Sequence, residues 1–224
     1  MQISIIVPML NEAPILPGLL SHLSQFVRQG AEVLLVDGGS DDTSLQLARA
    51  AGFAALGAPR GRASQMNAGA MHATGDVLLF LHADTRLPAT ALQDIRHALA
   101  RGRHVWGRFD VTIQGQSPWF PLIARLMNLR SRITGIATGD QGIFVTREAF
   151  FQVGCYPNQP LMEDIELSMH LKRLSPPACL RAAVTTSGRR WETRGVWRTI
   201  LLMWTLRLRY FLGANPEALA KAYR

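Results

Sequence analysis

Three clusters of polar residues stand directly after apolar runs in the first hundred residues of the chain. They are Asn11-Glu12 after residues 3–7, Asp37 to Asp42 after residues 32–36, and His82-Ala83-Asp84 after residues 77–81. A carboxylate in such a place can hold Mg²⁺ or Mn²⁺, because these ions take one or two carboxylates and complete their coordination with water and diphosphate oxygens. Asp84 is therefore a candidate metal ligand, with a capped turn before Pro88 as the structural alternative.

The segment that begins at Asp37 reads Asp-Gly-Gly-Ser-Asp-Asp. Its glycines would let a ligand approach the backbone, and the Asp37 carboxylate could then contact a ribose or a base. A glycine-rich turn followed by a helix N-cap explains Asp41 and Asp42 but leaves Asp37 unexplained. Asp37 is therefore a candidate nucleoside-binding residue.

Two motifs in the second half of the chain also carry residues that could do chemistry. Glu163-Asp164-Ile165-Glu166-Leu167 opens a predicted helix. Acids there suit the helix dipole, but one of the carboxylates could equally serve as a general base. Arg189-Arg190-Trp191 offers guanidinium groups suited to a diphosphate and an indole that can stack, although a solvated basic loop would contain the same residues.

The elements around the first three clusters alternate between strand and helix. The predicted strands span residues 3–7, 32–36, 53–56 and 77–81, and the predicted helices span residues 11–29, 43–51, 64–73 and 88–100. This alternation is typical of an α/β fold with a mostly parallel, doubly wound sheet and helices on both faces. Ligands of such sheets bind outside the carboxyl ends of the strands, which is where the three polar clusters lie.

The second half is less regular. The predicted strands there span residues 105–113, 141–146 and 182–186, and the predicted helices span residues 117–133 and 163–174, with one final helix after residue 187. No internal repeat, low-complexity segment or linker interrupts the chain, so we predict one domain with a C-terminal appendage.

The ordered set of motifs resembles the family 2 glycosyltransferases, and its later members resemble a small bacterial subgroup of that family. The motifs are residues 4–12 (Ser-Ile-Ile-Val-Pro-Met-Leu-Asn-Glu), 36–43 (Val-Asp-Gly-Gly-Ser-Asp-Asp-Thr), 75–84 (Gly-Asp-Val-Leu-Leu-Phe-Leu-His-Ala-Asp), 139–144 (Gly-Asp-Gln-Gly-Ile-Phe), 163–167 (Glu-Asp-Ile-Glu-Leu) and 189–192 (Arg-Arg-Trp-Glu). The resemblance implies the nucleotide-diphospho-sugar transferase (GT-A) fold. The catalytic domain would span residues 1–190, and a helical appendage would span residues 191–224.

The resemblance also implies a binding site for a nucleotide-diphospho-sugar donor. The implied donor-binding residues are Pro8, Asn11, Glu12, Asp37, Arg62, Asn67, His82, Ala83, Asp84, Arg190 and Trp191. Asp37 would contact the base, and Asp84 matches the Asp of the family's Asp-x-Asp motif that binds Mg²⁺ or Mn²⁺. His82 replaces the first Asp of that motif, which usually contacts the ribose. The metal would therefore be held by one carboxylate and the diphosphate.

The implied catalytic and acceptor residues lie in the second half of the chain. Asp164 matches the base of the family's Glu-Asp motif with Glu163 beside it, and Asp140 and Gln141 would contact the acceptor. Ser187 stands where processive members have a Gln, which favours a single transfer. One base without a second nucleophilic carboxylate implies single displacement with inversion. The implied activity is metal-dependent, inverting, non-processive transfer of a sugar to a hydroxyl, carboxylate or phosphate on a lipid-like acceptor.

Other classes of protein could use similar residues. A nucleotidyltransferase or a Rossmann oxidoreductase would need a glycine-rich loop after the first strand, but residues 8–14 contain no glycine and no cation. A two-carboxylate hydrolase would need neither Asp37 nor the Arg pair. A non-catalytic nucleotide-binding or membrane-surface module would not need Asp84 and Asp164 to converge on one pocket, so their convergence discriminates between a module and an enzyme.

The charge of the 224-residue chain is concentrated near its C-terminus. The net charge is +8, of which residues 185–224 contribute +6, and this favours phosphate chemistry or a membrane surface over nucleic acid as a partner. Cys155 and Cys179 cannot form a disulfide framework and lack the spacing of metal ligands. With neither a signal peptide nor a clean apolar run of about 18 residues, we expect a cytoplasmic protein.

The pattern of the C-terminal tail predicts an amphipathic helix. At 100° per residue, a basic stripe about 60° wide contains Arg194, Arg198, Thr205 and Arg209. The remaining arc is apolar and contains Trp197 and Trp204, with Arg207 as the exception opposite the stripe. Such a helix suits peripheral contact with the inner face of the cell membrane. Packing on the catalytic domain, or on a second copy of the chain in a homo-oligomer, is the alternative.

Overall fold

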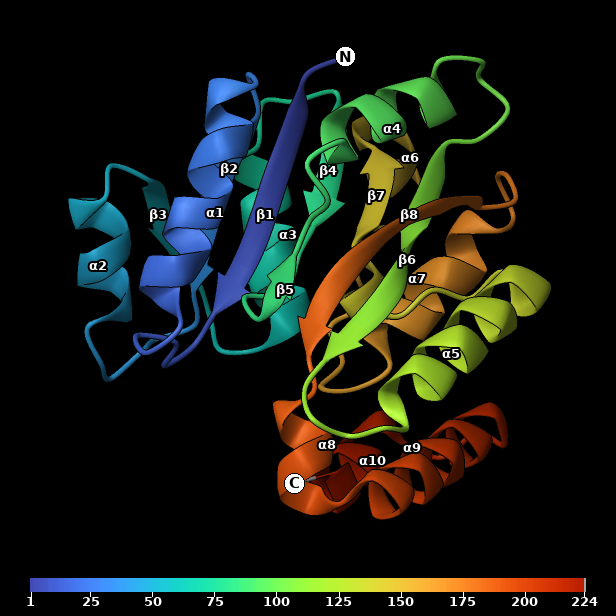
Figure 1. Ribbon diagram of the computed structural model, residues 1–224. Helices are drawn as coiled ribbons and strands as arrows, with labels where there is room; N and C mark the ends of the chain where they lie inside the picture. The colour runs from blue at the N-terminus through green and yellow to red at the C-terminus, as the bar shows by residue number, and fades with distance from the viewer. Residues whose placement is uncertain (224) are drawn as a thin grey trace.

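A computed structural model describes residues 1–223 (Figure 1). The strands are β1 (Ile3–Met9), β2 (Glu32–Asp37), β3 (Ala54–Gly57), β4 (Val77–Phe80), β5 (Thr85–Arg86), β6 (Trp106–Gln114), β7 (Ile143–Thr146) and β8 (Ala178–Ser187). The helices are α1 (Leu16–Arg28), α2 (Ser44–Ala50), α3 (Arg62–His72), α4 (Ala91–Leu99), α5 (Phe120–Thr134), the 3₁₀ turn η1 (Gly139–Gln141), α6 (Arg147–Gln152), α7 (Glu163–Leu171), α8 (Arg189–Arg194), α9 (Val196–Phe211) and α10 (Pro216–Tyr223).

The described strands form one eight-stranded sheet in the order β3-β2-β1-β4-β7-β6-β8-β5. The first four strands of this order pair in parallel, as do β6 and β8. β7 runs antiparallel to both of its neighbours, and β5 runs antiparallel to β8. The mostly parallel α/β sheet predicted from the sequence is thus confirmed, with antiparallel pairing confined to the pairs that involve β7 or β5.

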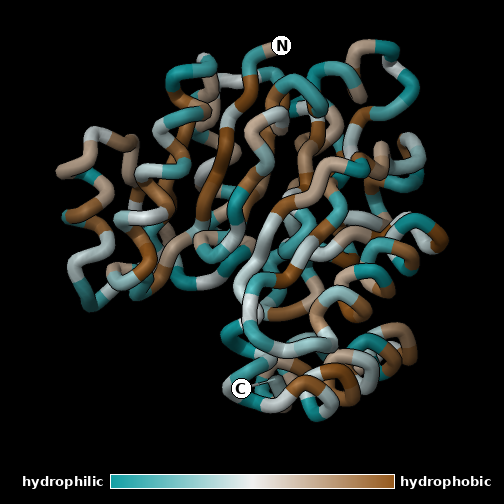
Figure 2. Tube along the Cα trace, viewed as in Figure 1, coloured by the Kyte–Doolittle hydropathy of each residue, from teal (hydrophilic) through white to brown (hydrophobic). Residues whose placement is uncertain are grey.

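Helices cover both faces of the sheet because alternate residues of the central strands face opposite ways. Ile5 and Val7 of β1 pack in the apolar cluster that includes α1 and α4, whereas Ile6 packs in the cluster that includes α3, α6 and α7. All three side chains are fully buried. Figure 2 shows the corresponding concentration of apolar residues along the central strands.

The C-terminal region differs from the prediction of a single final helix, which is wrong. Gly195 and Gly213 adopt φ angles of +84° and +86°, which favour glycine and interrupt the helical path, so α8, α9 and α10 form in place of one helix. These helices lie at the end of the sheet toward which β1, β6 and β8 point (Figure 1). Leu206 of α9 and Leu219 of α10 pack with Ile165 of α7 in a third apolar cluster.

None of the helices within residues 1–223 is both long enough and apolar enough to cross a bilayer.

Candidate active site

The carboxyl ends of β1 and β2 are joined by hydrogen bonds from two loops. Asn11, with a φ of +55°, donates its backbone N–H to Ser40 Oγ at 2.9 Å and accepts the N–H of Asp41 at its Oδ1 at 2.9 Å. Asp37 is buried and accepts the N–H groups of Gly39 and Ser40 at 3.0 Å each. The turn therefore fixes the Asp37 carboxylate at the strand end, a structural role that the sequence did not predict for this residue.

Glu12 lies where the ends of β1, β4 and β8 approach one another. Its backbone N–H donates to Ser44 Oγ at 2.8 Å. Burial and the nearby Asp84 carboxylate raise the pKa of Glu12, while the charges of Arg189 and Arg62 oppose that rise. Two acids and two guanidinium groups thus share one region at the carboxyl edge of the sheet.

Asp84 lies between β4 and β5 with little to bind its carboxylate. Its only hydrogen bond within residues 1–223 is a long one of 3.4 Å, from Thr85 Oγ1 to Oδ1. The described residues contain no group of three or more His, Cys, Asp or Glu side chains able to enclose a metal. A single carboxylate with free lone pairs beside a second acid fits Mg²⁺ or Mn²⁺ that is shared with a diphosphate, and does not fit an all-protein metal cage.

The 3₁₀ turn η1 connects the end of β4 to the first turn of α7. His82 Nδ1 lies 3.2 Å from Asp140 Oδ1, a contact that requires the ring proton on Nδ1. The neighbouring Gly139 donates its N–H to Asp164 Oδ2 at 2.9 Å. Burial opposes the charged form of Asp140, but the hydrogen bond and charge of His82 and the charge of Arg62 lower its pKa overall. His82 of the donor motif and Asp164, the predicted base, thus contact neighbouring residues of the same 3₁₀ turn.

Glu163 and Asp164 are the first two residues of α7. They follow Met162, the N-cap residue, which has a φ of +67°. Glu163 is 6 % exposed, and burial and the charge of Asp164 raise its pKa. Asp164 Oδ1 accepts the N–H of Ile165 at 2.8 Å, so each of its oxygens has one backbone donor and keeps a free lone pair. Burial, followed by the charges of Asp164 and Glu163, raises the pKa of Tyr156 well above its usual value. Of the two acids, Asp164 is the one whose orientation is fixed by η1.

Arg62 begins α3 and presents an exposed side chain to these acids. The surrounding protein disfavours its charge, but the carboxylates of Glu163, Asp140 and Asp164 outweigh this effect and raise its pKa. The charge of Arg62 also opposes the rise in the pKa of Glu12. This one guanidinium therefore lies within electrostatic range of Glu12 at the donor end and of Glu163 and Asp164 at the start of α7.

Several predicted site residues have structural partners in this region. Gln141 is fully buried, and its side chain caps η1 by accepting the N–H of Thr138 at 3.2 Å. Asn67 donates to the backbone oxygen of Tyr156 and accepts its N–H, at 2.9 and 3.0 Å. Pro8 near the end of β1 and Ala83 in the loop between β4 and β5 are also buried. The side-chain amides of Gln141 and Asn67 are thus already hydrogen-bonded to the loops of the site and help to hold them in place.

Arg190 faces the C-terminal helix, whereas Arg189 faces the donor end. The Arg190 guanidinium lies 3.6 Å from the centre of the Tyr223 ring and donates to the Tyr223 carbonyl oxygen at 3.2 Å. Burial, opposed by the proximity of Tyr223, lowers the pKa of Arg190. Trp191 is half-buried beside it. Arg189 belongs to the predicted motif but not to the donor-binding residues that the resemblance implied, and it is the member of the pair whose charge acts on Glu12.

Arg130 of α5 and Arg207 of α9 are further charged residues of this region that were not predicted. The charges of Asp164 and Asp140 act on both guanidinium groups. The signal for Arg207 was its isolated place on the apolar side of the helical wheel. Nothing in the sequence distinguished Arg130 from the other arginines of its helix.

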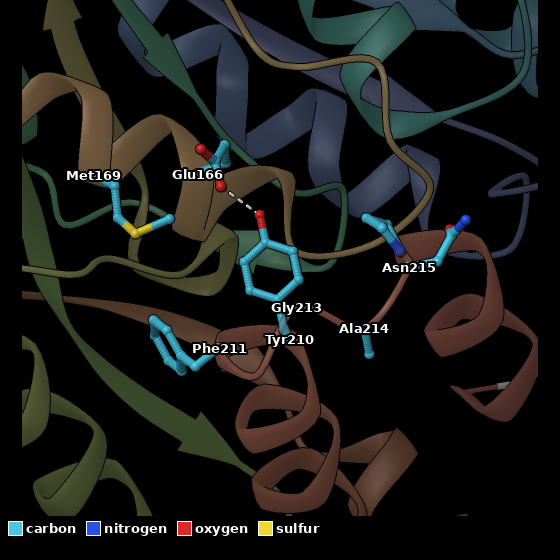
Figure 3. A pocket seen from close by; sticks show the side chains of 8 residues that line it. Glu166, Met169, Tyr210, Phe211, Gly213, Ala214 and Asn215 are labelled. Carbon is cyan, nitrogen blue, oxygen red and sulfur yellow. Dashed lines mark hydrogen bonds between the residues drawn. The ribbon is translucent and has the colours of Figure 1, made fainter.

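A hollow of about 590 Å³ lies beside the site, between α7 and the α9–α10 connection (Figure 3). It is lined by Glu166, Met169, Tyr210, Phe211, Gly213, Ala214, Asn215 and Pro216. The Tyr210 hydroxyl donates to Glu166 Oε2, as Figure 3 shows, and burial and this bond raise the pKa of Tyr210 to about 12. Neither Asp84 nor Asp164 lines the hollow, so we do not assign it to the active site. The bond from Tyr210 to Glu166 at its wall attaches α9 to α7, the helix that carries Asp164.

Comparison with known sequences identifies the family. The model of glycosyl transferase family 2 matches residues 4–154. Undecaprenyl-phosphate 4-deoxy-4-formamido-L-arabinose transferase from Sodalis glossinidius (strain morsitans) is 34 % identical over 154 residues, covering 63 % of this chain and 47 % of that protein. The protein of the same name from Yersinia pestis (strain Pestoides F) is 29 % identical over 153 residues, covering 63 % and 46 %. The chain thus spans about half the length of these curated relatives.

Comparison with solved structures identifies the fold. Mannosyltransferase PcManGT from Pyrobaculum calidifontis, in complex with GDP-Man and Mn²⁺, matches with a TM-score of 0.69 and 19 % identity, over 99 % of this chain and 68 % of that one. TarS from S. aureus matches with a TM-score of 0.67 and 19 % identity, over 84 % and 61 %. Together with the family match, this similarity shows that the chain is a glycosyltransferase of family 2 with the GT-A fold.

Proposed function

We propose that the protein is a metal-dependent, inverting, non-processive glycosyltransferase that uses a nucleotide-diphospho-sugar donor. The observation that carries the proposal is the connection from His82 through η1 to Asp164, which brings the donor motif and the candidate base into one region. A non-catalytic nucleotide-binding module would need only the donor end of this arrangement.

In the proposed reaction Asp164 accepts the proton of the attacking acceptor oxygen, which belongs to a hydroxyl or to a monoprotonated phosphate. The acceptor oxygen attacks the anomeric carbon as the bond from that carbon to the diphosphate breaks, and the nucleoside diphosphate departs with the bonding electrons. The two N–H groups on Asp164 orient the carboxylate and leave one lone pair on each oxygen for the proton. Attack opposite the leaving group inverts the configuration at the anomeric carbon.

The donor end would hold and neutralise the leaving diphosphate. Mg²⁺ or Mn²⁺ bound to Asp84 would supply positive charge to the diphosphate oxygens. Arg189 and Arg62, which both act on Glu12, would provide the guanidinium groups for the same anion. His82, held by Asp140, would face the ribose, and Asp37 the base. Two structural neighbours, PcManGT and glucosyl-3-phosphoglycerate synthase from Mycobacterium tuberculosis, are described as complexes with Mn²⁺ and a nucleotide or nucleotide sugar, which supports this assignment.

We propose that the acceptor is lipid-like and that the enzyme works at a membrane surface. The two curated relatives are named as undecaprenyl-phosphate 4-deoxy-4-formamido-L-arabinose transferases, and undecaprenyl phosphate is a lipid. α5 and α9 each leave an apolar row exposed, comprising Trp119, Leu122, Leu126, Leu129 and Ile133 on or beside α5 and Trp197, Leu201, Trp204, Leu208 and Phe211 on α9. The rings of Trp119 and Trp197 are 5.0 Å apart, so the two rows meet at one end. In this proposal residues 191–224 act as an appendage to the catalytic domain that contributes half of the lipid-facing surface.

A screen for donor hydrolysis and transfer tests the proposal. UDP- and GDP-sugars are incubated with the protein and Mg²⁺ or Mn²⁺, with and without a prenyl phosphate acceptor, and Asp84→Ala and Asp164→Asn serve as controls. We expect one nucleotide series to be turned over by the wild-type protein and by neither variant. Nucleotide binding without turnover under any of these conditions would favour the non-catalytic module.

A further inference from the structure

Arg130 and Arg207 have guanidinium nitrogens buried without a hydrogen-bond partner. These are Nε and Nη2 of Arg130 and Nε of Arg207, and within residues 1–223 neither side chain forms a hydrogen bond or an ion pair. Buried donors of this kind are costly unless something satisfies them. The other nitrogens of the two groups are not enclosed in this way and remain able to meet a ligand.

The two guanidinium groups act on each other as like charges. Burial and the charge of Arg207 lower the pKa of Arg130 to about 10. Asp140 and Asp164 are near enough to favour both charges but make no ion pair with either arginine; their oxygens bind His82 Nδ1 and the N–H groups of Gly139 and Ile165. The pair therefore lacks a counter-charge in contact with it, although it lies beside the proposed base.

The fold holds Arg207 in this position. Leu206 is buried against Ile165 of α7, and Tyr210, one turn after Arg207, bonds to Glu166 of the same helix. Arg207 and Tyr210 are three residues apart and lie on one face of the helix, so the bond from Tyr210 to Glu166 directs Arg207 toward the start of α7. An arginine on the packed side of an otherwise apolar helix face is expensive to keep there without a ligand.

We propose that Arg130 and Arg207 form a binding site for the phosphate group of a phosphomonoester acceptor. Two guanidinium groups match the charge and the fork geometry of a phosphate group. The adjacent residues Leu129 and Leu208 belong to the exposed apolar rows of α5 and α9, so an apolar tail on the acceptor would have a surface to follow. Assigning the anion to the acceptor rests on the proposed function, but the existence of the anion site does not.

Arg189 and Arg62 both act electrostatically on Glu12 at the donor end, and Arg130 and Arg207 do not. Arg62 also shares Asp140 and Asp164 with the pair, so Arg189 is the arginine that belongs to the donor end alone. Binding of phosphate and binding of nucleotide should therefore respond to different substitutions.

Binding measurements on the full chain test the proposal without any assay of transfer. Isothermal titration measures inorganic phosphate, glycerol 3-phosphate and a short prenyl monophosphate in detergent, and the nucleotide is measured separately. Arg130→Gln/Arg207→Gln should weaken binding of all three phosphates by about 10- to 100-fold and leave nucleotide binding within about twofold. The matched control Arg125→Gln/Arg209→Gln removes two exposed arginines from the same helices and should bind like the wild type.

Each outcome decides one part of the proposal. Stronger binding of the prenyl phosphate than of glycerol 3-phosphate assigns the site to a lipid headgroup, and equal binding assigns it to a small soluble phosphomonoester. Phosphate that competes with nucleotide, or a double variant that loses both, would place the pair in the donor site and overturn the proposal. If the variant does not fold, phosphate should slow phenylglyoxal modification of Arg207 more than that of Arg209 in the wild-type protein. If phosphate slows the modification of Arg207 and of Arg209 by the same factor, the proposal is also overturned.

Discussion

The backbone N–H of Gly139 donates a hydrogen bond to Oδ2 of Asp164 at 2.9 Å. This bond crosses from η1 to the first turn of α7, and it fixes the orientation of the carboxylate that we propose as the base. A Cβ atom on Gly139 would lie 2.3 Å from His82 Nε2. The same glycine therefore sets the distance between η1 and the histidine of the donor motif.

Gly139→Ala should disturb both ends of the site at once. The added methyl group would push the His82 ring or η1 away, and Asp164 would lose or lengthen its hydrogen bond. We expect kcat to fall by about tenfold or more and the donor KM to rise, with little change in Tm because the φ of Gly139 is not among the positive ones. In His82→Ala/Gly139→Ala the clash is absent, so the double variant should be no slower than His82→Ala alone. Losses that multiply would contradict the contact.

Asp164→Asn tests the base directly. The amide keeps the shape of the side chain but cannot accept a proton, so transfer should fall on the order of 10²-fold or more while nucleotide binding is retained. Rapid kinetics and equilibrium titration of the nucleotide measure the two effects. Normal transfer by this variant together with loss in Glu163→Gln would show that Glu163 is the base, and a product with retained anomeric configuration would exclude single displacement.

Asp84→Ala tests the metal site. With one carboxylate available, the variant should lose the ability of Mg²⁺ or Mn²⁺ to strengthen nucleotide diphosphate binding, and EDTA should have the same effect on the wild type. Titration of UDP or GDP with and without the ion measures the change. Asp76→Ala, which removes an exposed carboxylate at the opposite end of β4, is the control. Full transfer in chelator would exclude the metal.

Local sequence predicted the first half of the fold well because its signals are local. The apolar runs of β1, β2 and β4 and the acidic ends that follow them are continuous in sequence, and parallel pairing brings those ends to one edge. The second half depends on non-local pairing. The prediction placed β8 at residues 182–186, but it begins at Ala178 because its first residues pair with Gly107 and the residues after it, across a register shift between Phe109 and Asp110.

The acceptor side of the site was predicted least well for the same reason. Gln141 was predicted to contact the acceptor, but its buried amide caps η1, which only the three-dimensional path of the loop reveals. Arg130 and Arg207 come from α5 and α9, between which η1, β7, α6, α7, β8 and α8 lie in the chain, so no short motif contains both. The charge of Arg207 was visible as an exception on the helical wheel, but its counterpart on α5 was not.

Glu163→Gln should change the pH dependence of stability. The folded state raises the pKa of Glu163 above its usual value near 4.5, so the ionised form destabilises the fold at neutral pH. As pH falls through the folded pKa toward the unfolded one, protonation removes this destabilisation from the wild type. The variant should therefore melt at a higher temperature than the wild type at pH 7, and the difference should disappear near pH 4. A Tm difference that is constant from pH 7 to pH 4 would contradict the shift.

The exposed apolar rows of α5 and α9 should bind anionic membranes. Trp197 and Trp204 are 58 % and 66 % exposed, and exposed Arg198 and Arg209 stand on the same helix. An apolar face bordered by cations suits the interface of a bilayer that contains anionic lipid, because tryptophan enters the headgroup region and arginine meets the phosphates. We therefore expect co-sedimentation with vesicles that contain an anionic phospholipid and weaker binding as salt rises.

Paired substitutions separate the apolar contact from simple charge. Trp197→Glu/Trp204→Glu should abolish co-sedimentation with the anionic vesicles. Gln46→Glu/Gln93→Glu makes the same change in net charge on exposed residues of α2 and α4, so it should retain most of the binding. If the wild-type protein ignores lipid and instead sediments as a dimer that the two tryptophan substitutions dissociate, the rows face a second copy of the chain. If both double variants lose lipid binding equally, net charge alone attracts the protein and the tryptophans do not enter the bilayer.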